Sequence, residues 1–199
     1  MFIKLIDNVP VEYNVFNLRK DNPNTSFPEI ISDEMLFSYG IHKVVEQDRP
    51  DHNPLTQHLS WSIENIDGIW YKVWAIIDFP IDVSISNQRE FVKKRRDLEI
   101  SSGILIPIDE SGNTIEIATD DISQSRITGA ALAVTLDPSL TIQWKSENGF
   151  IHLDSTQIIA IAQMIRAHVQ ACFNREAELI SLIESDMPYD IESGWPSTT

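Results

Sequence analysis

The chain contains 199 residues, and 30 Asp and Glu against 15 Lys and Arg give it a formal net charge of -15 at pH 7. This length accommodates one or two small domains, and a hydrophobic fraction of 42% excludes a wholly disordered chain. The acidic excess is present in residues 1–80 and again in residues 81–199, so we expect no nucleic acid among the partners of either part.

Cys172 is the only cysteine, so the chain has no internal disulfide framework. Two interpretations of this thiol remain open, a small buried residue on a helix or a disulfide to another chain. The segment Met1–Asp7 is a short apolar stretch broken by charge, which is not typical of a signal peptide, and no run of about 18 apolar residues occurs. We therefore expect no membrane partner and a chain that begins near Met1 and folds in the cytoplasm.

The first 45 residues predict a series of short elements. Strands are expected at Phe2–Ile6 and, after a turn, around Val11–Leu18. A short helix is expected at Glu34–Tyr39, because the preceding Ser32-Asp33 pair can accept a hydrogen bond from a free N–H at the helix start. The next segment, Ile41–Val45, is expected to be extended.

The strongest local signal is a hairpin of two strands, Leu59–Ile66 and Ile69–Ile77, joined by Asp67-Gly68. An Asp-Gly pair favours a type I′ turn, in which both central residues have positive φ. The polar segment 48–57 before the hairpin contains two prolines and is expected to be an exposed loop. Apolar side chains share one face of each strand: Leu59, Trp61 and Ile63 on the first, and Trp70, Trp74 and Ile76 on the second.

Beyond residue 80 the pattern changes to a mixture of helices and short hairpins. Asp121 or Ser123 is the expected cap of the shorter helix, and Asn148-Gly149 indicates a type I′ turn in the second hairpin. The expected elements are a helix at 86–101, a hairpin pairing 104–108 with 114–119, a helix at 123–134 and a hairpin pairing 141–145 with 150–153.

The longest predicted element is an amphipathic helix at Thr156–Ser185, capped by Asp154-Ser155 and about 45 Å long. It either covers the local sheet or leaves part of its apolar stripe for another chain, and Trp195 in the extended segment after it is a candidate docking residue. The candidate interaction residues are Ile158, Ile161, Ile165, Val169, Cys172, Leu179, Ile183 and Trp195.

These elements predict an α+β protein with two parts. Residues 1–80 form a module rich in antiparallel β-hairpins. Residues 81–199 form a mixed module with short hairpins and the long C-terminal amphipathic helix.

The sequence contains none of the standard catalytic or phosphate-binding motifs, so we expect no enzyme, no catalytic residues and no cofactor. His52 and His58 lie near Asp48 and Asp51, but their spacing matches no metal-site template, and no metal is expected. His168 lies four residues before Cys172 on the long helix, where a Cys–His pair is geometrically permitted but nothing indicates an oxyanion hole.

The run Lys93-Lys94-Arg95-Arg96 is the only cluster of positive charge. On a helix these four side chains point in different directions, so they are expected to be solvated or ion-paired and not to form a basic face. Arg95 lies near the apolar side of the helix and is expected to make an internal ion pair.

Two sets of motifs resemble parts of bacteriophage tail proteins. Asn17–Pro28, Leu36 with Tyr39–Val44, and Asp67–Trp74 resemble the N-terminal module of many small phage tail and tail-fibre-associated proteins. A second set resembles a domain common at the C-termini of phage tail-fibre proteins: Arg89, Arg96, Ser102–Ile104, Ile117–Asp120, Ser123–Ala130, Ile142–Trp144, Gly149, Phe150, Leu153 and Gly194–Pro196.

The resemblance implies a structural protein of the virion tail, as a tail fibre, a fibre adaptor or a baseplate-attached protein, that works through protein contacts. Its partners would be other tail or baseplate proteins, copies of itself with a trimer favoured, and a host surface receptor. The alternative is a tail-fibre assembly chaperone that does not remain in the virion. The chain has no long fibrous or repeated segment, which favours a short fibre, a connector or a chaperone over a fibre shaft.

Overall fold

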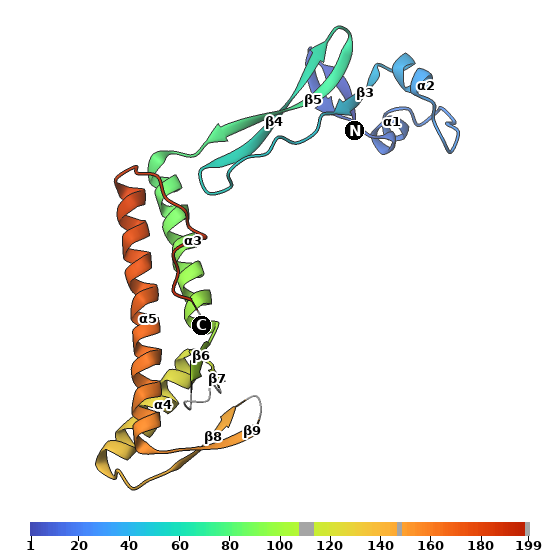
Figure 1. Ribbon diagram of the computed structural model, residues 1–199. Coiled ribbons are helices and arrows are strands. Elements are labelled where there is room, and N and C mark those ends of the chain that lie inside the picture. The colour runs from blue at the N-terminus through green and yellow to red at the C-terminus, as the bar shows by residue number, and fades with distance from the viewer. Residues whose placement is uncertain (108–113, 147–148, 198–199) are drawn as a thin grey trace. The chain divides into compact units, whose positions relative to one another are not determined.

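The protein has an α+β fold (Figure 1). The computed structural model describes residues 1–107, 114–146 and 149–197. The chain divides into two compact units, Met1–Ile81 and Asp82–Thr199, so the division falls next to the position where the sequence pattern changes. Each unit is built around its own hydrophobic clusters.

The N-terminal unit is a five-stranded sheet with two short helices. The strand order is β2-β1-β3-β5-β4, and every pair is antiparallel except β3 with β5. Its elements are β1 (Phe2–Ile6), β2 (Val9–Glu12), α1 (Val15–Asp21), α2 (Asp33–Ser38), β3 (Ile41–Glu46), β4 (Gln57–Ile66) and β5 (Ile69–Asp78).

The expectation of a strand at Val11–Leu18 is wrong, because that segment divides into the end of β2 and the start of α1. Asn14 stops the strand by forming a reciprocal capping box, in which its side chain accepts from the Asn17 N–H at 2.9 Å and the Asn17 side chain accepts from the Asn14 N–H at 3.1 Å. The helix then places Leu18 in a buried cluster with Tyr13, Leu36 and Ile41.

Other local expectations for this unit are confirmed. Ser32 caps α2, and the strands β4 and β5 form the predicted hairpin with Asp67 at φ 53° and Gly68 at φ 83°. The parallel pairing of β3 with β5 has no local signal in the sequence, since the loop 47–56 and the whole of β4 separate the two strands in the chain.

The described residues of the C-terminal unit form three helices and two separate two-stranded sheets. The turns expected around residues 110–113 and 147–148 lie at least partly outside the described residues. Its elements are α3 (Ile81–Ser101), β6 (Ile104–Pro107), β7 (Thr114–Ile117), α4 (Asp121–Leu136), β8 (Ile142–Ser146), β9 (Gly149–Leu153) and α5 (Ser155–Glu184).

Two helix starts differ from the sequence-based expectation. Helix α3 begins at Ile81, five residues before the expected start, and α4 is capped by Asp120 in place of Asp121 or Ser123. The Asp120 side chain accepts hydrogen bonds from the backbone N–H groups of Ile122 and Ser123 at 2.9 and 3.0 Å. The Asp154 cap of α5 is confirmed, and it forms a capping box with Gln157.

Helix α5 runs through the whole unit and takes part in both of its clusters. Figure 1 shows its first half beside α4 and the hairpins, and its second half beside α3. The N-terminal half contributes Ile158, Ile161, Ile165 and Val169 to a cluster with side chains of β6, β7, β9 and α4. The C-terminal half contributes Leu179 and Ile183 to a second cluster with Val92 of α3.

Of the two alternatives for the apolar stripe of α5, the structure supports the one in which the stripe covers its own unit. All seven helix positions named in the sequence analysis are buried inside the unit: Ile158, Ile161, Ile165, Val169, Cys172, Leu179 and Ile183. The physical reason is that two small hairpins and two helices need one long apolar surface to bury their own apolar faces.

We predict that Ile161→Ala lowers the free energy of unfolding by about 2–5 kcal/mol, because it leaves a cavity at a position that is 2% exposed. The matched control is Ile159→Ala on the same helix, where the side chain is 37% exposed, and about 1 kcal/mol or less is expected. Chemical denaturation of the full chain measures both. Equal losses would contradict the assignment of the stripe to the core.

Candidate interaction surface

The hairpin β4–β5 contains no buried residue, although it carries three of the five tryptophans. The register places Leu59 opposite Ile76, Trp61 opposite Trp74, and Ile63 opposite Lys72. Residues that face each other in an antiparallel pair lie on the same side of the sheet, so these side chains form one continuous face. We call this surface the tryptophan face: Leu59, Trp61, Ile63, Trp70, Lys72, Trp74 and Ile76.

Much of the tryptophan face is open to solvent within its unit. Trp61 is 50% exposed and Ile76 is 43% exposed, while Trp70 and Trp74 are half-buried. A strand with one solvated and one packed face normally directs its large apolar residues to the packed side. Here no residue of the apolar face is fully buried within the unit: five of its seven side chains are partly buried, and Trp61 and Ile76 are exposed.

Two cations border the tryptophan face. The Lys72 ammonium lies 5.1 Å from the ring centroid of Trp61 and 4.4 Å from that of Trp74, and the Arg49 guanidinium lies 4.8 Å from the Trp74 ring. Lys72 also pairs with Glu46 at 2.9 Å, and this ion pair lowers the pKa of the Glu46 carboxyl group. Aromatic rings in contact with cations are held in fixed positions and stay available for a further apolar contact.

Trp74 has a second unusual property. Its indole Nε1 is buried and has no hydrogen-bond partner among the described residues. A buried N–H without an acceptor is unfavourable by about 1–3 kcal/mol. The ring is therefore held by its faces, between Arg49 and Lys72, and not by its polar atom.

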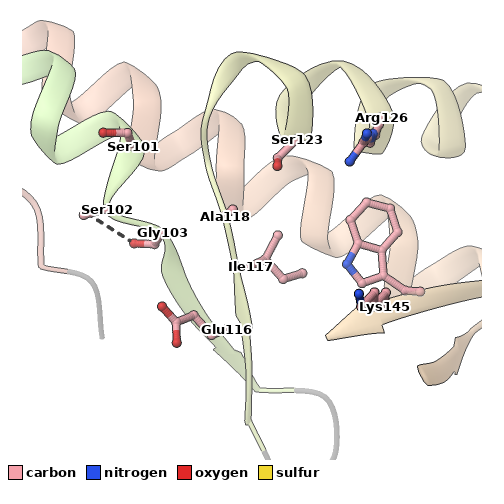
Figure 2. A pocket seen from close by; sticks show the side chains of 10 residues that line it. Ser101, Ser102, Gly103, Glu116, Ile117, Ala118, Ser123, Arg126 and Lys145 are labelled. Carbon is pink, nitrogen blue, oxygen red and sulfur yellow. Dashed lines mark hydrogen bonds between the residues drawn. The ribbon is translucent and has the colours of Figure 1, made fainter. Parts of the chain in front are cut away.

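A separate pocket of about 330 Å³ lies in the C-terminal unit, between the end of α3, strand β7, α4 and β8 (Figure 2). Figure 2 shows Arg126 and Lys145 on one side of it and Glu116 on the other, with Ile117 between them. Ser123 also lines the pocket, but its hydroxyl donates to the capping carboxylate of Asp120 at 2.8 Å. The Ser123 hydroxyl in this pocket therefore serves the capping of α4.

A second groove, of about 610 Å³, lies between α4 and α5 and is mostly apolar. Three alanines, Ala131, Ala162 and Ala167, are among the residues that line it. Beside it, Leu136 at the end of α4 is 79% exposed. This groove cannot be recognised in the sequence, because alanine contributes little to hydrophobic periodicity.

The pair formed by Cys172 and His168 is structural. The Cys172 sulfur lies 3.8 Å from His168 Nε2, and the same nitrogen lies 3.0 Å from the backbone carbonyl of Glu99. A carbonyl oxygen accepts only, so Nε2 carries its proton and cannot act as a base toward the thiol. Burial, assisted by the nearby Glu99 charge, raises the pKa of Cys172 to about 11, which disfavours the nucleophilic thiolate.

Cys172 is fully buried, which fits the interpretation as a small core residue and leaves no sulfur surface for a disulfide to another chain. His52 and His58 do not gather with acidic residues either. Among the residues that the structure describes, no group of three or more His, Cys, Asp or Glu could hold a metal ion. His58 instead stacks on Phe79 with the ring centroids 5.0 Å apart.

The basic run on α3 is largely consumed by ion pairs. Arg95 pairs with Glu99 at 2.7 Å, which confirms the expected internal pair, and Arg96 pairs with Glu176 of α5 at 2.5 Å and with Asp97 at 2.6 Å. The Arg96 and Glu176 side chains are both mostly buried, so this pair joins α3 to α5. Lys94 lies 3.9 Å from Glu90, so three of the four cations of the run lie within ion-pair distance of an acidic side chain.

Trp195 docks on its own unit. Its indole N–H donates to the Ile191 carbonyl at 2.7 Å, and its ring packs against the cluster of Val92, Leu179 and Ile183. Arg175 fixes the segment further by donating to the carbonyls of Asp190 and Ser193 at 2.9 and 3.2 Å. The sequence marked Trp195 but gave no signal for the Arg175 contacts.

The comparisons with known proteins place the C-terminal unit in a family. The family described as "Domain of unknown function (DUF4376)" matches residues 86–193, which is more than half of the chain, and the protein belongs to this family. No curated protein and no solved structure matches the chain. No helix in the described ranges is long and apolar enough to cross a membrane. The family description assigns no activity, and the tryptophan face lies outside the matched residues.

We predict that Cys172 in the folded protein resists thiol-labelling reagents at pH 8 and reacts fully after denaturation. The pKa is raised from 9.0 to about 11, so the folded state favours the neutral thiol. This contribution to stability is complete below about pH 9 and is lost as the pH rises through about 11. Mass spectrometry of labelled protein, native and unfolded, measures the difference. Rapid native labelling at pH 8 would contradict the buried position.

Proposed function

We propose that this protein is a structural or assembly component of a bacteriophage tail that works through protein contacts, with the tryptophan face as its contact surface. The observation that carries the proposal is the hairpin β4–β5, in which Trp61 and Ile76 remain exposed and no residue is buried. Exposed apolar patches bordered by polar residues are typical of interaction sites.

The composition of the face also supports a protein partner. Tryptophan is enriched among the residues that contribute most to binding in protein interfaces, and apolar neighbours exclude water around it. Lys72 and Arg49 bring positive charge beside the rings in a chain whose net charge is -15. An acidic or apolar protein surface would complement this arrangement.

The assignment to a phage tail rests on the resemblance of the motif order along the chain. Mass spectrometry of purified particles of the encoding phage tests it. We expect peptides of this protein at a level comparable to those of tail proteins. Absence from particles, together with co-purification with a fibre protein from lysate, would favour the assembly chaperone. Absence from both would refute the proposal.

The contact surface is tested by a pair of matched variants. Ile76 and Ile77 are adjacent in β5 and are each 43% exposed, but they lie on opposite faces of the sheet. We expect Ile76→Ser to reduce incorporation into particles, or binding to the fibre protein, by about tenfold, and Ile77→Ser to leave it nearly unchanged. Quantitative mass spectrometry in a complementation assay measures both. Equal effects would remove the tryptophan face as the contact surface.

A further inference from the structure

Strand β4 is an edge of the sheet with an open hydrogen-bonding side. It is the last strand in the order β2-β1-β3-β5-β4, and within the described residues no strand pairs with its outer edge. The Lys72 carbonyl of β5 accepts from Gln47, away from β4, so Ile63, which faces Lys72, directs its own N–H and C=O outward. The same alternation directs the backbone groups of Leu59 and Trp61 outward.

This edge lacks the usual features that prevent strand pairing. Sheet edges in monomeric proteins are usually short or carry proline or lysine. The opposite edge, β2, is 4 residues long and contains Pro10. Strand β4 is 10 residues long, contains neither proline nor lysine, and carries Glu64 as its only acidic residue.

The sequence of β4 is also symmetric in chemical type. Trp61 is the centre, and residues at equal distances on either side of it are matched or complementary. The pairs are Ser60 with Ser62, Leu59 with Ile63, His58 with Glu64, and Gln57 with Asn65.

We propose that β4 pairs antiparallel with β4 of a second copy of this chain, about a two-fold axis through Trp61. An antiparallel pair with this axis places Leu59 opposite the partner's Ile63 and His58 opposite the partner's Glu64. Apolar side chains then meet apolar ones on the tryptophan face, and an imidazole meets a carboxylate on the other face. The two five-stranded sheets become one continuous sheet.

Other registers fit less well. Centring the axis on Ser62 places Leu59 opposite the partner's Asn65 and leaves Glu64 opposite a serine. Centring it on Ser60 places Ile63 opposite the partner's Gln57, whose N–H already donates to the Asn53 carbonyl at 2.8 Å. In the register centred on Trp61 the new ladder uses Leu59, Trp61 and Ile63, all of which direct their backbone groups outward.

This inference rests on the proposed function, since it names one partner of the same hairpin. It also makes a specific statement about symmetry. A two-fold edge pairing closes after two chains, so this surface forms a dimer and not the trimer that the resemblance implies. Further tail proteins would then bind a surface that two copies share.

Disulfide trapping tests the register. Ser60 lies opposite the partner's Ser62 at a non-hydrogen-bonded pair, where Cα atoms are about 4.5 Å apart and a disulfide fits, while two copies of residue 60 are beyond about 7 Å. We expect co-expressed Ser60→Cys and Ser62→Cys full-length chains to form a mixed disulfide dimer at least tenfold more than either variant alone. The wild-type chain, with Cys172 buried, is the control for background crosslinking.

Sedimentation of the uncrosslinked protein supplies the second measurement. The wild-type chain should have the mass of two chains. Trp61→Glu, which places two carboxylates at the axis, should weaken dimerisation at least tenfold, whereas Val9→Glu on the opposite sheet edge, at a position that is 58% exposed, should not.

Two results would overturn the pairing: a monomeric wild-type chain with no mixed disulfide, or equal crosslinking by Ser60→Cys alone. If the pairing fails while Ile76→Ser still reduces incorporation into particles, the proposed function stands without it. If the dimer forms but the protein is absent from both particles and fibre-protein complexes, the pairing stands and the tail function fails.

Discussion

The C-terminal unit depends on the burial of one face of α5. A two-stranded sheet cannot bury its own apolar side, and this unit contains two of them, β6–β7 and β8–β9. Each becomes stable only by packing on a shared apolar surface, and the N-terminal half of a 30-residue helix supplies it. The same helix then reaches α3, where Leu179 and Ile183 surround Val92 and the mostly buried pair of Arg96 with Glu176 fixes the alignment.

In the N-terminal unit, by contrast, a large part of the apolar surface is not buried in a core. Its buried cluster of Tyr13, Leu18, Leu36 and Ile41 lies where α1 and α2 pack on the sheet, and it does not extend to β4 and β5. The hairpin is held by its strand pairing, its turn and the cations around Trp74. Apolar surface that is not needed for the core is thereby available for binding, in the part of the chain that lies outside the family match.

Polar residues that attract attention in the sequence are mostly used for structure. Three residues of the basic run, Lys94, Arg95 and Arg96, form ion pairs with acidic residues on α3, on α5 and in the C-terminal segment. His168 secures the Glu99 carbonyl, and Cys172 beside it is a protonated core residue. In the pocket of Figure 2 the positive charge of Arg126 and the negative charge of Glu116 lie on opposite sides.

The sequence by itself determined the elements whose signals are local: the Asp67-Gly68 hairpin, the Ser32 and Asp154 caps and the long amphipathic helix. It could not determine which apolar faces are covered, because strand and helix periodicity show that a face is apolar but not what lies against it. Tertiary structure decided between the two alternatives for the stripe of α5, which is core, and left Trp61 and Ile76 of the tryptophan face exposed. It also decided the parallel β3–β5 pair and the open edge of β4, because both depend on contacts between residues far apart in the chain.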